Sequence, residues 1–236
     1  MKGRCTNMVE SFALCLPKQY DDDLFRKLMP LIDRHKQMKI SKYHRWEDVF
    51  RSLLGDVLAR YVINVKTNLP IREVVFCQNS YGKPYVKGIT GLHFNISHSG
   101  NWVVCAVGSA PVGVDIERIA DSDLSIAKRF FTKREYKWLY EKNDQERKQS
   151  FYKLWTMKES YIKAVGKGLS IPLESFEIIP DLSVLITVMA NGLDTGYRVN
   201  CHYIDCDHVF SVCSKTRQFC EKVNIKCINE LINYVK

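Results

Sequence analysis

Two acidic residues, Asp115 and Glu117, have the spacing that can hold a metal ion. They lie in the segment 112–117, VGVDIE, which follows the apolar segment 103–107 after a short turn. Side chains alternate along a strand, so both carboxylates project from one face. Adjacent carboxylates repel each other unless a cation lies between them, and oxygen ligands favour a hard cation such as Mg²⁺. The pair equally fits an ordinary strand with a solvated acidic face, and its spacing alone leaves both interpretations open.

A helix expected over residues 150–165, SFYKLWTMKESYIKAV, carries a second set of candidate groups and ends at Gly166. Trp155, Glu159 and Lys163 recur at every fourth position, so they share one face of that helix. A carboxylate and an ammonium one turn apart can form a surface ion pair. Alternatively, Glu159 completes a three-carboxylate Mg²⁺ site with the strand acids, and Lys163 contacts the anion bound there.

Three further segments have residues suited to binding phosphate. His98 follows Ser97 at the end of an expected strand, where an imidazole beside hydroxyls can donate to a phosphate oxygen or serve a structural role. Lys83 follows Gly82 in a turn, and glycine lets a backbone approach a phosphate closely. The segment 34–45 has lysines three residues apart, whose ammonium groups can address one region. These are Lys36, Lys39 and Lys42.

Composition bounds the class of protein. With 236 residues and 46% hydrophobic content, the chain forms one large or two small domains with a substantial core. The apolar runs are far shorter than a membrane span, so we expect a cytoplasmic protein. Nine cysteines without a C-x-x-C pair argue against a disulfide framework and a zinc ribbon. Residues 1–114 have 16 basic and 9 acidic side chains, an excess that attracts a phosphorylated ligand, an acidic protein or nucleic acid.

The expected elements alternate between helix and strand on both sides of a junction near Pro111. The first part has a strand over 8–16, a helix over 24–34 that Pro30 interrupts, and an amphipathic helix over 46–64. The second part has helices over 125–131 and 133–141, followed by strands within residues 176–214.

Several sequence blocks together resemble one enzyme family. They are similar to the signature blocks of 4′-phosphopantetheinyl transferases, most closely those of the surfactin-synthetase-activating (Sfp) type. The blocks are NISHSG (95–100), GVDIE (113–117), RFF (129–131) and LWTMKESYIKAVGKGLS (154–170), with RSLLGDVLAR (51–60) and YGKP (81–84) in support. Their order and spacing match over residues 36–176, which makes the combination specific although each block alone is not.

The resemblance implies a fold, a reaction and partners. The fold would be α+β, a monomer built as a pseudo-twofold pair of subdomains over residues 1–110 and 111–236, with coenzyme A bound in the cleft between them. The reaction would transfer the phosphopantetheine arm of coenzyme A to a serine of an apo peptidyl or acyl carrier protein and release 3′,5′-ADP. Mg²⁺, with Mn²⁺ as a substitute, would be required. The Sfp-like blocks suggest service to nonribosomal peptide or polyketide synthesis.

The resemblance also assigns roles to matched positions. The acids Asp115, Glu117 and Glu159 would bind the metal. Lys163 would lie near the reacting phosphate. Our mechanistic hypothesis is that Glu159, or a water it orients, accepts the proton of the carrier serine, with Glu135 as a second candidate base. Lys163 would then neutralise or protonate the departing ADP oxygen. The positions matched to coenzyme contacts are Lys36, Lys39, Arg51, Ser52, Gly82, Lys83, Ser97, His98, Lys158 and Lys163. Ser52 stands where the family pattern has threonine, which keeps the hydroxyl.

Two alternatives come from other functional classes. A nucleic-acid-binding module would use the same basic segment, but the sequence has no recognisable zinc, RNP or KH signature. A non-catalytic relative that only binds carrier proteins would not need the acids and the lysine of the reaction, and all of them are present. We therefore expect coenzyme A and a carrier protein as partners, with no nucleic acid and no membrane.

Overall fold

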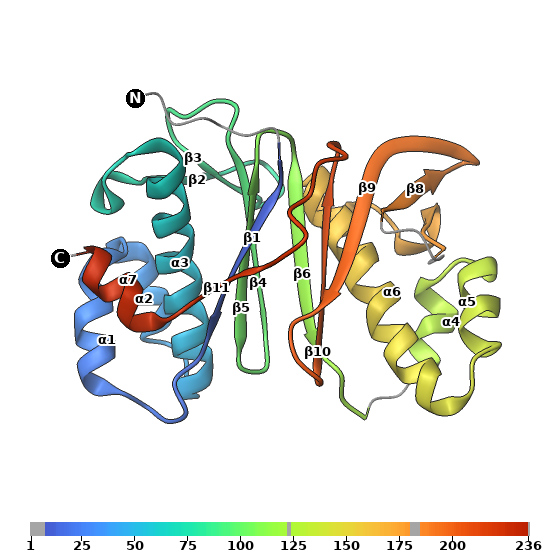
Figure 1. Cartoon of the computed structure of the whole chain (residues 1–236), viewed down its shortest axis with the longest axis horizontal. Coiled ribbons are helices and arrows are strands. Elements are labelled where there is room, and N and C mark those ends of the chain that lie inside the picture. Colours follow the sequence, from blue (N-terminus) through green and yellow to red (C-terminus); the bar gives the residue numbers. More distant parts are fainter. Residues whose placement is uncertain (1–7, 122–123, 180–184, 236) are drawn as a thin grey trace.

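The computed structural model describes residues 8–121, 124–179 and 185–235. Its elements form four layers in the order helix, sheet, sheet, helix (Figure 1). One hydrophobic core lies between the first sheet and the helices that cover it, and another lies between the second sheet and the helices within residues 127–165. A third core, which includes Ala13, Val104, Val114 and Phe210, joins strands of both sheets. The mixed helix and strand composition agrees with the predicted α+β class.

The first half of the chain supplies a sheet covered by a long helix. Its elements are β1 (Glu10–Cys15), α1 (Asp22–Leu28), α2 (Arg34–Ile40), α3 (Trp46–Thr67), β2 (Phe76–Gln78), β3 (Pro84–Val86), β4 (His93–Ser99) and β5 (Trp102–Gly108). The helix expected over 24–34 breaks at a 3₁₀ turn, Met29–Leu31, which contains Pro30 as predicted. Helix α3 turns Leu54, Val57 and Leu58 toward the core, the stripe that its sequence predicts.

The second half repeats the combination of sheet and long helix. Its elements are β6 (Val112–Arg118), α4 (Ala127–Phe130), α5 (Lys133–Tyr140), α6 (Asp144–Val165), β7 (Phe176–Glu177), β8 (Ile186–Ala190), β9 (Leu193–Tyr203) and β10 (His208–Ser214). Helix α6 begins six residues before the predicted start, because the Asn143 side chain caps it by accepting from the Glu146 amide at 3.0 Å. It ends at Gly166, as predicted, with a left-handed cap at φ +75°. Residues 180–184 of the predicted strand region lie outside the described residues.

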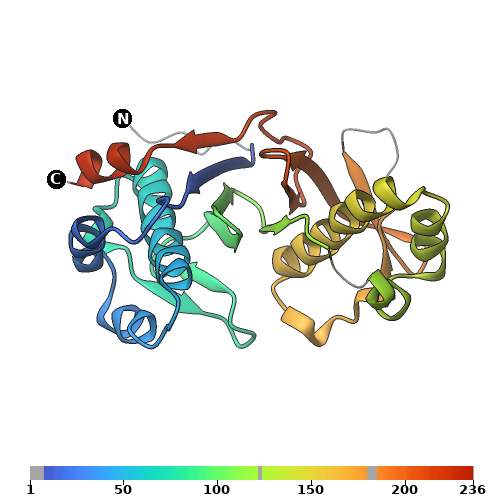
Figure 2. The same ribbon diagram turned by 90° about the horizontal axis from the view of Figure 1, so that it is seen from below.

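The last segment of the chain returns to the first sheet. Strand β11 (Asn224–Lys226) pairs in parallel with β1, which gives the strand order β11-β1-β5-β4. Helix α7 (Ile228–Val235) then places Leu231 in the core of the first half. Figures 1 and 2 both show this red segment beside the blue first strand. The sequence division at residues 110 and 111 falls just before β6, but the segment 224–235 packs with the first half rather than the second.

The two sheets meet along strands β4 and β6. Strand β6 pairs with β10 in the order β6-β10-β9-β8-β7, and β4 pairs with β5. Between them, side chains at alternate positions of β4 accept hydrogen bonds from alternate backbone amides of β6. The bonds run to Asn95 Oδ1 from Val114 N (2.8 Å), to Ser97 Oγ from Ile116 N (3.4 Å) and to Ser99 Oγ from Arg118 N (3.0 Å). A row of side chains thus replaces a backbone ladder where the halves join.

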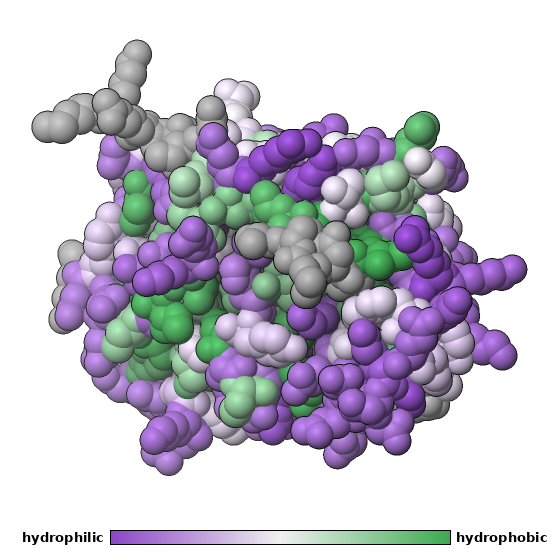
Figure 3. Space-filling model, turned by 45° about the vertical axis from the view of Figure 1, so that its right-hand side comes forward, coloured by the Kyte–Doolittle hydropathy of each residue, from purple (hydrophilic) through white to green (hydrophobic). Residues whose placement is uncertain are grey.

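The surface is mostly polar on the face that Figure 3 shows, with apolar side chains in separate patches. Among the described residues, none of the helices combines the length and apolarity needed to cross a membrane.

Candidate active site

The three acidic residues predicted to bind the metal line one cavity of about 380 Å³ at the junction of the halves. Asp115 and Glu117 come from the same face of β6, as strand alternation predicts. Trp155, Glu159 and Lys163 come from one face of α6, as the four-residue spacing predicts. The remaining wall is Ile96, Ser97 and His98 of β4.

Asp115 is the centre of the hydrogen bonds in this cavity. Its Oδ1 accepts from Lys163 Nζ at 2.6 Å and from Ser97 Oγ at 2.9 Å, and Lys163 Nζ also donates to Ser97 Oγ at 3.0 Å. Its Oδ2 is buried without a hydrogen-bond partner among the described residues. Glu117 Oε2 accepts from Ser99 Oγ at 2.8 Å. One carboxylate oxygen therefore stays unsatisfied at the point where the acids converge, and an unpaired buried acceptor is costly.

Burial and, to a smaller extent, neighbouring charge raise the pKa values of two of the carboxylates. Burial raises the pKa of Glu117, and the nearby Asp115 raises it further. Burial likewise raises the pKa of Glu159, again with a contribution from Asp115, while Lys163 opposes the rise. Such a set of oxygen donors suits a hard divalent cation. Within the described residues, however, no three acidic, histidine or cysteine side chains stand close enough to form a ready-made metal centre. The Lys163 ammonium supplies the positive charge beside Asp115.

Strand β6 and helix α6 approach each other closely because residue 113 is glycine. A Cβ on Gly113 would lie 2.1 Å from the carbonyl oxygen of Ser160 and 2.3 Å from the amide nitrogen of Ala164. Both atoms belong to the helix backbone and have no rotamer to move aside. The glycine of the GVDIE block therefore sets the distance between the strand that carries two acids and the helix that carries Glu159 and Lys163.

A larger cavity of about 810 Å³ adjoins the acidic one, since Ile96 and His98 line both. Four more of the residues matched to coenzyme contacts line it. They are Lys36 and Lys39 of α2 and Arg51 and Ser52 of α3. Arg51 is held by Asp48 at 2.6 Å and by the carbonyl of Gly100 at 2.7 Å. Although Asp33 and Asp56 also line the larger cavity, its basic side chains outnumber its acidic ones, which suits a ligand with several negative charges.

His98 stands between the basic and the acidic cavity. Burial lowers the pKa of its imidazole, and the nearby cations Arg51, Lys163 and Lys36 lower it as well. The neutral ring retains one N–H donor, and a bound anion would favour its protonation.

The turn that contains Gly82 and Lys83 is placed differently from the prediction. Gly82 has φ +84°, the left-handed conformation expected of a turn glycine. Lys83 Nζ points between β6 and α6, where it donates to the carbonyl oxygens of Val112 at 2.9 Å and Ala164 at 2.8 Å. Its ammonium is therefore already committed to the protein backbone.

Glu135 and Lys158 also differ from the prediction, because they do not reach the cavity. Both side chains are fully buried and form an ion pair, with Lys158 Nζ 2.7 Å from Glu135 Oε1. Glu135 additionally accepts from the amides of Thr132 and Ile178, and Lys158 donates to the carbonyl of Phe176. All of these groups are engaged, so the pair joins α5 and the segment at β7 to α6. Glu135 is therefore no candidate base, and Lys158 is no candidate coenzyme ligand.

Three residues that line or support the cavities were not predicted as site residues from the sequence. Arg60 and Arg72 line the larger cavity. The Arg60 guanidinium is buried against Asp56 and the carbonyl of Val74, at 2.6 Å from the latter. Ser99 holds Glu117. The only signal for Arg60 was its position four residues after Asp56 on a helix, which is typical of a surface ion pair.

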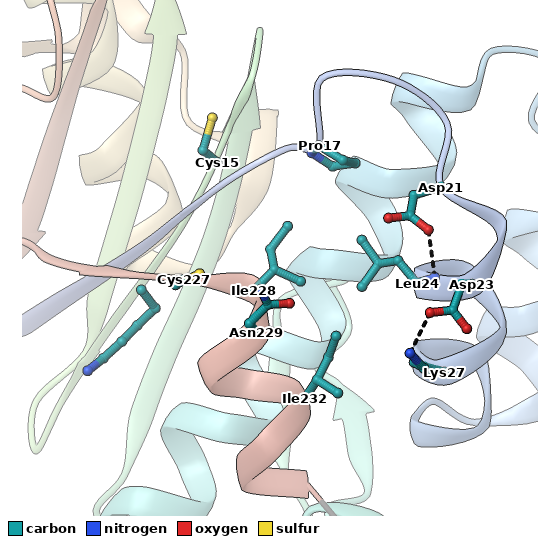
Figure 4. A pocket seen from close by; sticks show the side chains of 11 residues that line it. Cys15, Pro17, Asp21, Asp23, Leu24, Lys27, Cys227, Ile228, Asn229 and Ile232 are labelled. Atoms are coloured by element: carbon teal, nitrogen blue, oxygen red, sulfur yellow. Dashed lines mark hydrogen bonds and ion pairs between the residues drawn. The ribbon is translucent and has the colours of Figure 1, made fainter.

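Another hollow of about 370 Å³ lies between the end of β1, α1 and α7 (Figure 4). Its acidic groups are engaged locally: Asp21 caps α1 by accepting from the Leu24 amide at 2.9 Å, and Asp23 pairs with Lys27. It has none of the residues predicted to act on coenzyme A.

The chain is similar to known proteins over most of its length. Residues 19–110 match the profile of the N-terminal part of 4′-phosphopantetheinyl transferases, and residues 111–213 match that of the 4′-phosphopantetheinyl transferase superfamily. The chain is 41% identical over 205 residues to 4′-phosphopantetheinyl transferase gsp of Aneurinibacillus migulanus, covering 82% of this chain and 85% of that protein. It is 38% identical over 221 residues to 4′-phosphopantetheinyl transferase Sfp of Bacillus subtilis (strain 168), covering 94% and 99%.

Proposed function

The chain belongs to the Sfp-type 4′-phosphopantetheinyl transferases, and we propose that its acidic and basic cavities together form the coenzyme A site of that reaction. The enzyme is a holo-carrier-protein synthase: it transfers the phosphopantetheine arm of coenzyme A to an apo carrier protein. In the proposed site the basic cavity takes the phosphorylated nucleoside, and the pyrophosphate lies toward the acids. The observation that supports this arrangement is the shared wall of Ile96 and His98 between the two cavities.

We propose that Asp115, Glu117 and Glu159 hold a divalent cation, Mg²⁺ or Mn²⁺. The unpartnered buried oxygen of Asp115 and the raised pKa values of the two glutamates fit a site that needs a positive charge. When bound, such an ion reduces the repulsion between a diphosphate and an incoming nucleophile and polarises the phosphoryl oxygens. In its absence, the Lys163 ammonium partly neutralises Asp115.

The cationic side chains around the basic cavity would hold the charged groups of coenzyme A. Lys36, Lys39 and Arg51 approach it from α2 and α3, and His98 adds a donor from β4. Because phosphoryl transfer depends mainly on positioning and charge stabilisation, these contacts would set the orientation of the reacting phosphorus. Arg51 is already braced by Asp48 and Gly100, so its guanidinium loses little freedom on binding.

The proposed proton transfer uses α6. The carrier serine attacks the β-phosphorus, and Glu159, directly or through a water, accepts the hydroxyl proton. The new bond joins the serine oxygen to phosphorus, and the bond to the bridging oxygen of 3′,5′-ADP breaks. Lys163 then donates a hydrogen bond or a proton to that departing oxygen, for which it must exchange its contact with Asp115.

We further propose the finer features of the architecture and of the partner. Each half has one 22-residue helix on a largely antiparallel sheet, α3 in the first and α6 in the second, which supports a pseudo-twofold relation. A monomer would suffice, since both halves of the site lie on one chain. The net charge of +9 suits acidic carrier proteins, and synthesis of nonribosomal peptides or polyketides is the proposed role.

Intact mass spectrometry tests the proposed function. An apo peptidyl carrier protein is incubated with the enzyme, coenzyme A and Mg²⁺, with and without a chelator. A gain equal to one phosphopantetheine that disappears with chelator is expected. A gain that persists with chelator would contradict the metal site, and no gain on peptidyl, acyl and polyketide carriers alike would contradict the site as a whole.

A further inference from the structure

The turn between β2 and β3 reaches from the first half of the molecule to the end of helix α6. Lys83 Nζ donates to the carbonyl of Ala164, in the last turn of α6, at 2.8 Å and to the carbonyl of Val112, the first residue of β6, at 2.9 Å. Asn79 Nδ2 donates to the carbonyl of Gly166, the cap of α6, at 2.9 Å. One turn therefore contacts both elements that carry the acidic cavity.

Two of the carbonyls that receive these bonds, those of Ala164 and Gly166, belong to the end of α6. The last carbonyls of a helix have no intrahelical donor, and a positive charge at this end is favourable. Gly166 also makes room for the contact, since a Cβ there would lie 2.6 Å from Lys83 Cδ. The lysine stem thus packs directly on the helix cap, and its ammonium donates to a carbonyl in the last turn of α6.

The turn is built to hold this position. Asn79 Oδ1 accepts from the amides of Tyr81 and Lys83, both at 2.9 Å, and the Asn79 amide donates to the carbonyl of Lys83 at 3.0 Å. The turn is therefore braced from within. Burial lowers the pKa of Lys83 to about 8, and the two carbonyl oxygens are hydrogen-bond acceptors for its ammonium.

We propose that Lys83 and Asn79 are positioning residues, which fix the last turn of α6 against β6 and thereby hold Lys163 beside the reacting phosphate. Lys163 directly precedes Ala164, the residue whose carbonyl Lys83 binds. The inference rests on the role proposed above for Lys163. It differs from the coenzyme contact that the sequence predicted for Lys83, because a coenzyme ligand would govern affinity whereas a positioning residue governs turnover.

Substitution separates the two roles. Lys83→Met removes the ammonium and keeps an apolar stem, and Asn79→Asp keeps the acceptor that braces the turn but loses the donor to Gly166. We expect each to lower kcat about tenfold, as for a small misplacement of a catalytic group, while the dissociation constant of coenzyme A stays within about threefold. Lys87→Met, at an exposed lysine of the same region, is the matched control and should change neither. Weakened coenzyme binding with unchanged kcat would overturn the proposal.

A double-mutant cycle then tests whether Lys83 acts through Lys163. In the Lys163→Ala background, Lys83→Met should lower kcat less than about twofold, because the group it positions is gone. A full tenfold effect in that background would assign Lys83 a role independent of Lys163 and overturn the inference alone. If Lys163→Ala itself keeps normal kcat, the proposed role of Lys163 fails, and the inference fails with it. Thermal unfolding confirms folding of every variant, and Asn79→Asp serves if Lys83→Met does not fold.

Discussion

Gly113→Ala should separate the two elements of the active site by a distance that the structure defines. The added Cβ would meet the carbonyl oxygen of Ser160 at 2.1 Å, whereas ordinary contact begins at 3.4 Å, so β6 and α6 must part by about 1.3 Å. Overpacking of this kind costs about 1–3 kcal/mol of unfolding free energy. A displacement of about 1 Å between catalytic groups can cost about 100-fold in rate. We therefore expect kcat to fall between about 10-fold and 100-fold.

The assay is the rate of carrier-protein mass gain at a temperature where thermal unfolding shows every variant to be folded. Gly108→Ala is the control, because the nearest atom to its Cβ would be a side-chain atom, Val9 Cγ2, at 3.2 Å, with backbone atoms no nearer than 3.7 Å. Gly108 also lies outside the acidic and basic cavities. The control should keep nearly normal kcat. Normal kcat in Gly113→Ala, or an equal loss in both variants, would refute the argument that this glycine sets the geometry of the site.

Three further predictions concern the acids and their supports. Ser99→Ala removes the hydrogen bond to Glu117, so we expect the Mg²⁺ concentration for half-maximal rate to rise about tenfold. Ser99→Thr keeps the hydroxyl and should be nearly normal, and an unchanged Mg²⁺ titration in Ser99→Ala would contradict the prediction. Because the pKa values of Glu117 and Glu159 are raised in the folded protein, its metal-free form loses stability as pH rises from about 4.5 through those pKa values. The melting temperature of Glu117→Gln should therefore exceed that of the wild type by an amount that grows over this pH range, and added Mg²⁺ should remove the difference. A difference that stays constant with pH would contradict this prediction. Glu135→Gln leaves Lys158 buried without its partner and should destabilise the protein by about 3–5 kcal/mol in denaturant unfolding, while kcat of the folded enzyme stays near normal; lost kcat at full stability would return Glu135 to the reaction.

The positions of the acids could be predicted because they depend on local periodicity. Strand alternation puts Asp115 and Glu117 on one face, and helical spacing puts Glu159 and Lys163 on another. The resemblance to one family then predicted that the two faces meet in a single metal site. The boundaries were less accurate where a single cap decides them, as at Asn143.

Other features depend on contacts between distant parts of the chain, which periodicity does not show. Lys83 meets a carbonyl 81 positions away, and Glu135 meets an amide 43 positions away. From the sequence alone, Lys83 is therefore matched to a coenzyme contact, and Glu135 is a second candidate base. The return of β11 to β1 likewise depends on a pairing across almost the entire chain. Their roles follow only from the packing.

We propose that Asp115, Glu117 and Glu159 form the divalent-cation site of the coenzyme complex. Electron paramagnetic resonance of Mn²⁺ tests it directly, with coenzyme A present and no carrier protein. We expect about one bound Mn²⁺ per chain in the wild type and at least about tenfold weaker binding in Asp115→Asn, Glu117→Gln and Glu159→Gln. Glu141→Gln, at an exposed surface site, should bind Mn²⁺ as the wild type does. Equal Mn²⁺ binding by all four variants would contradict it.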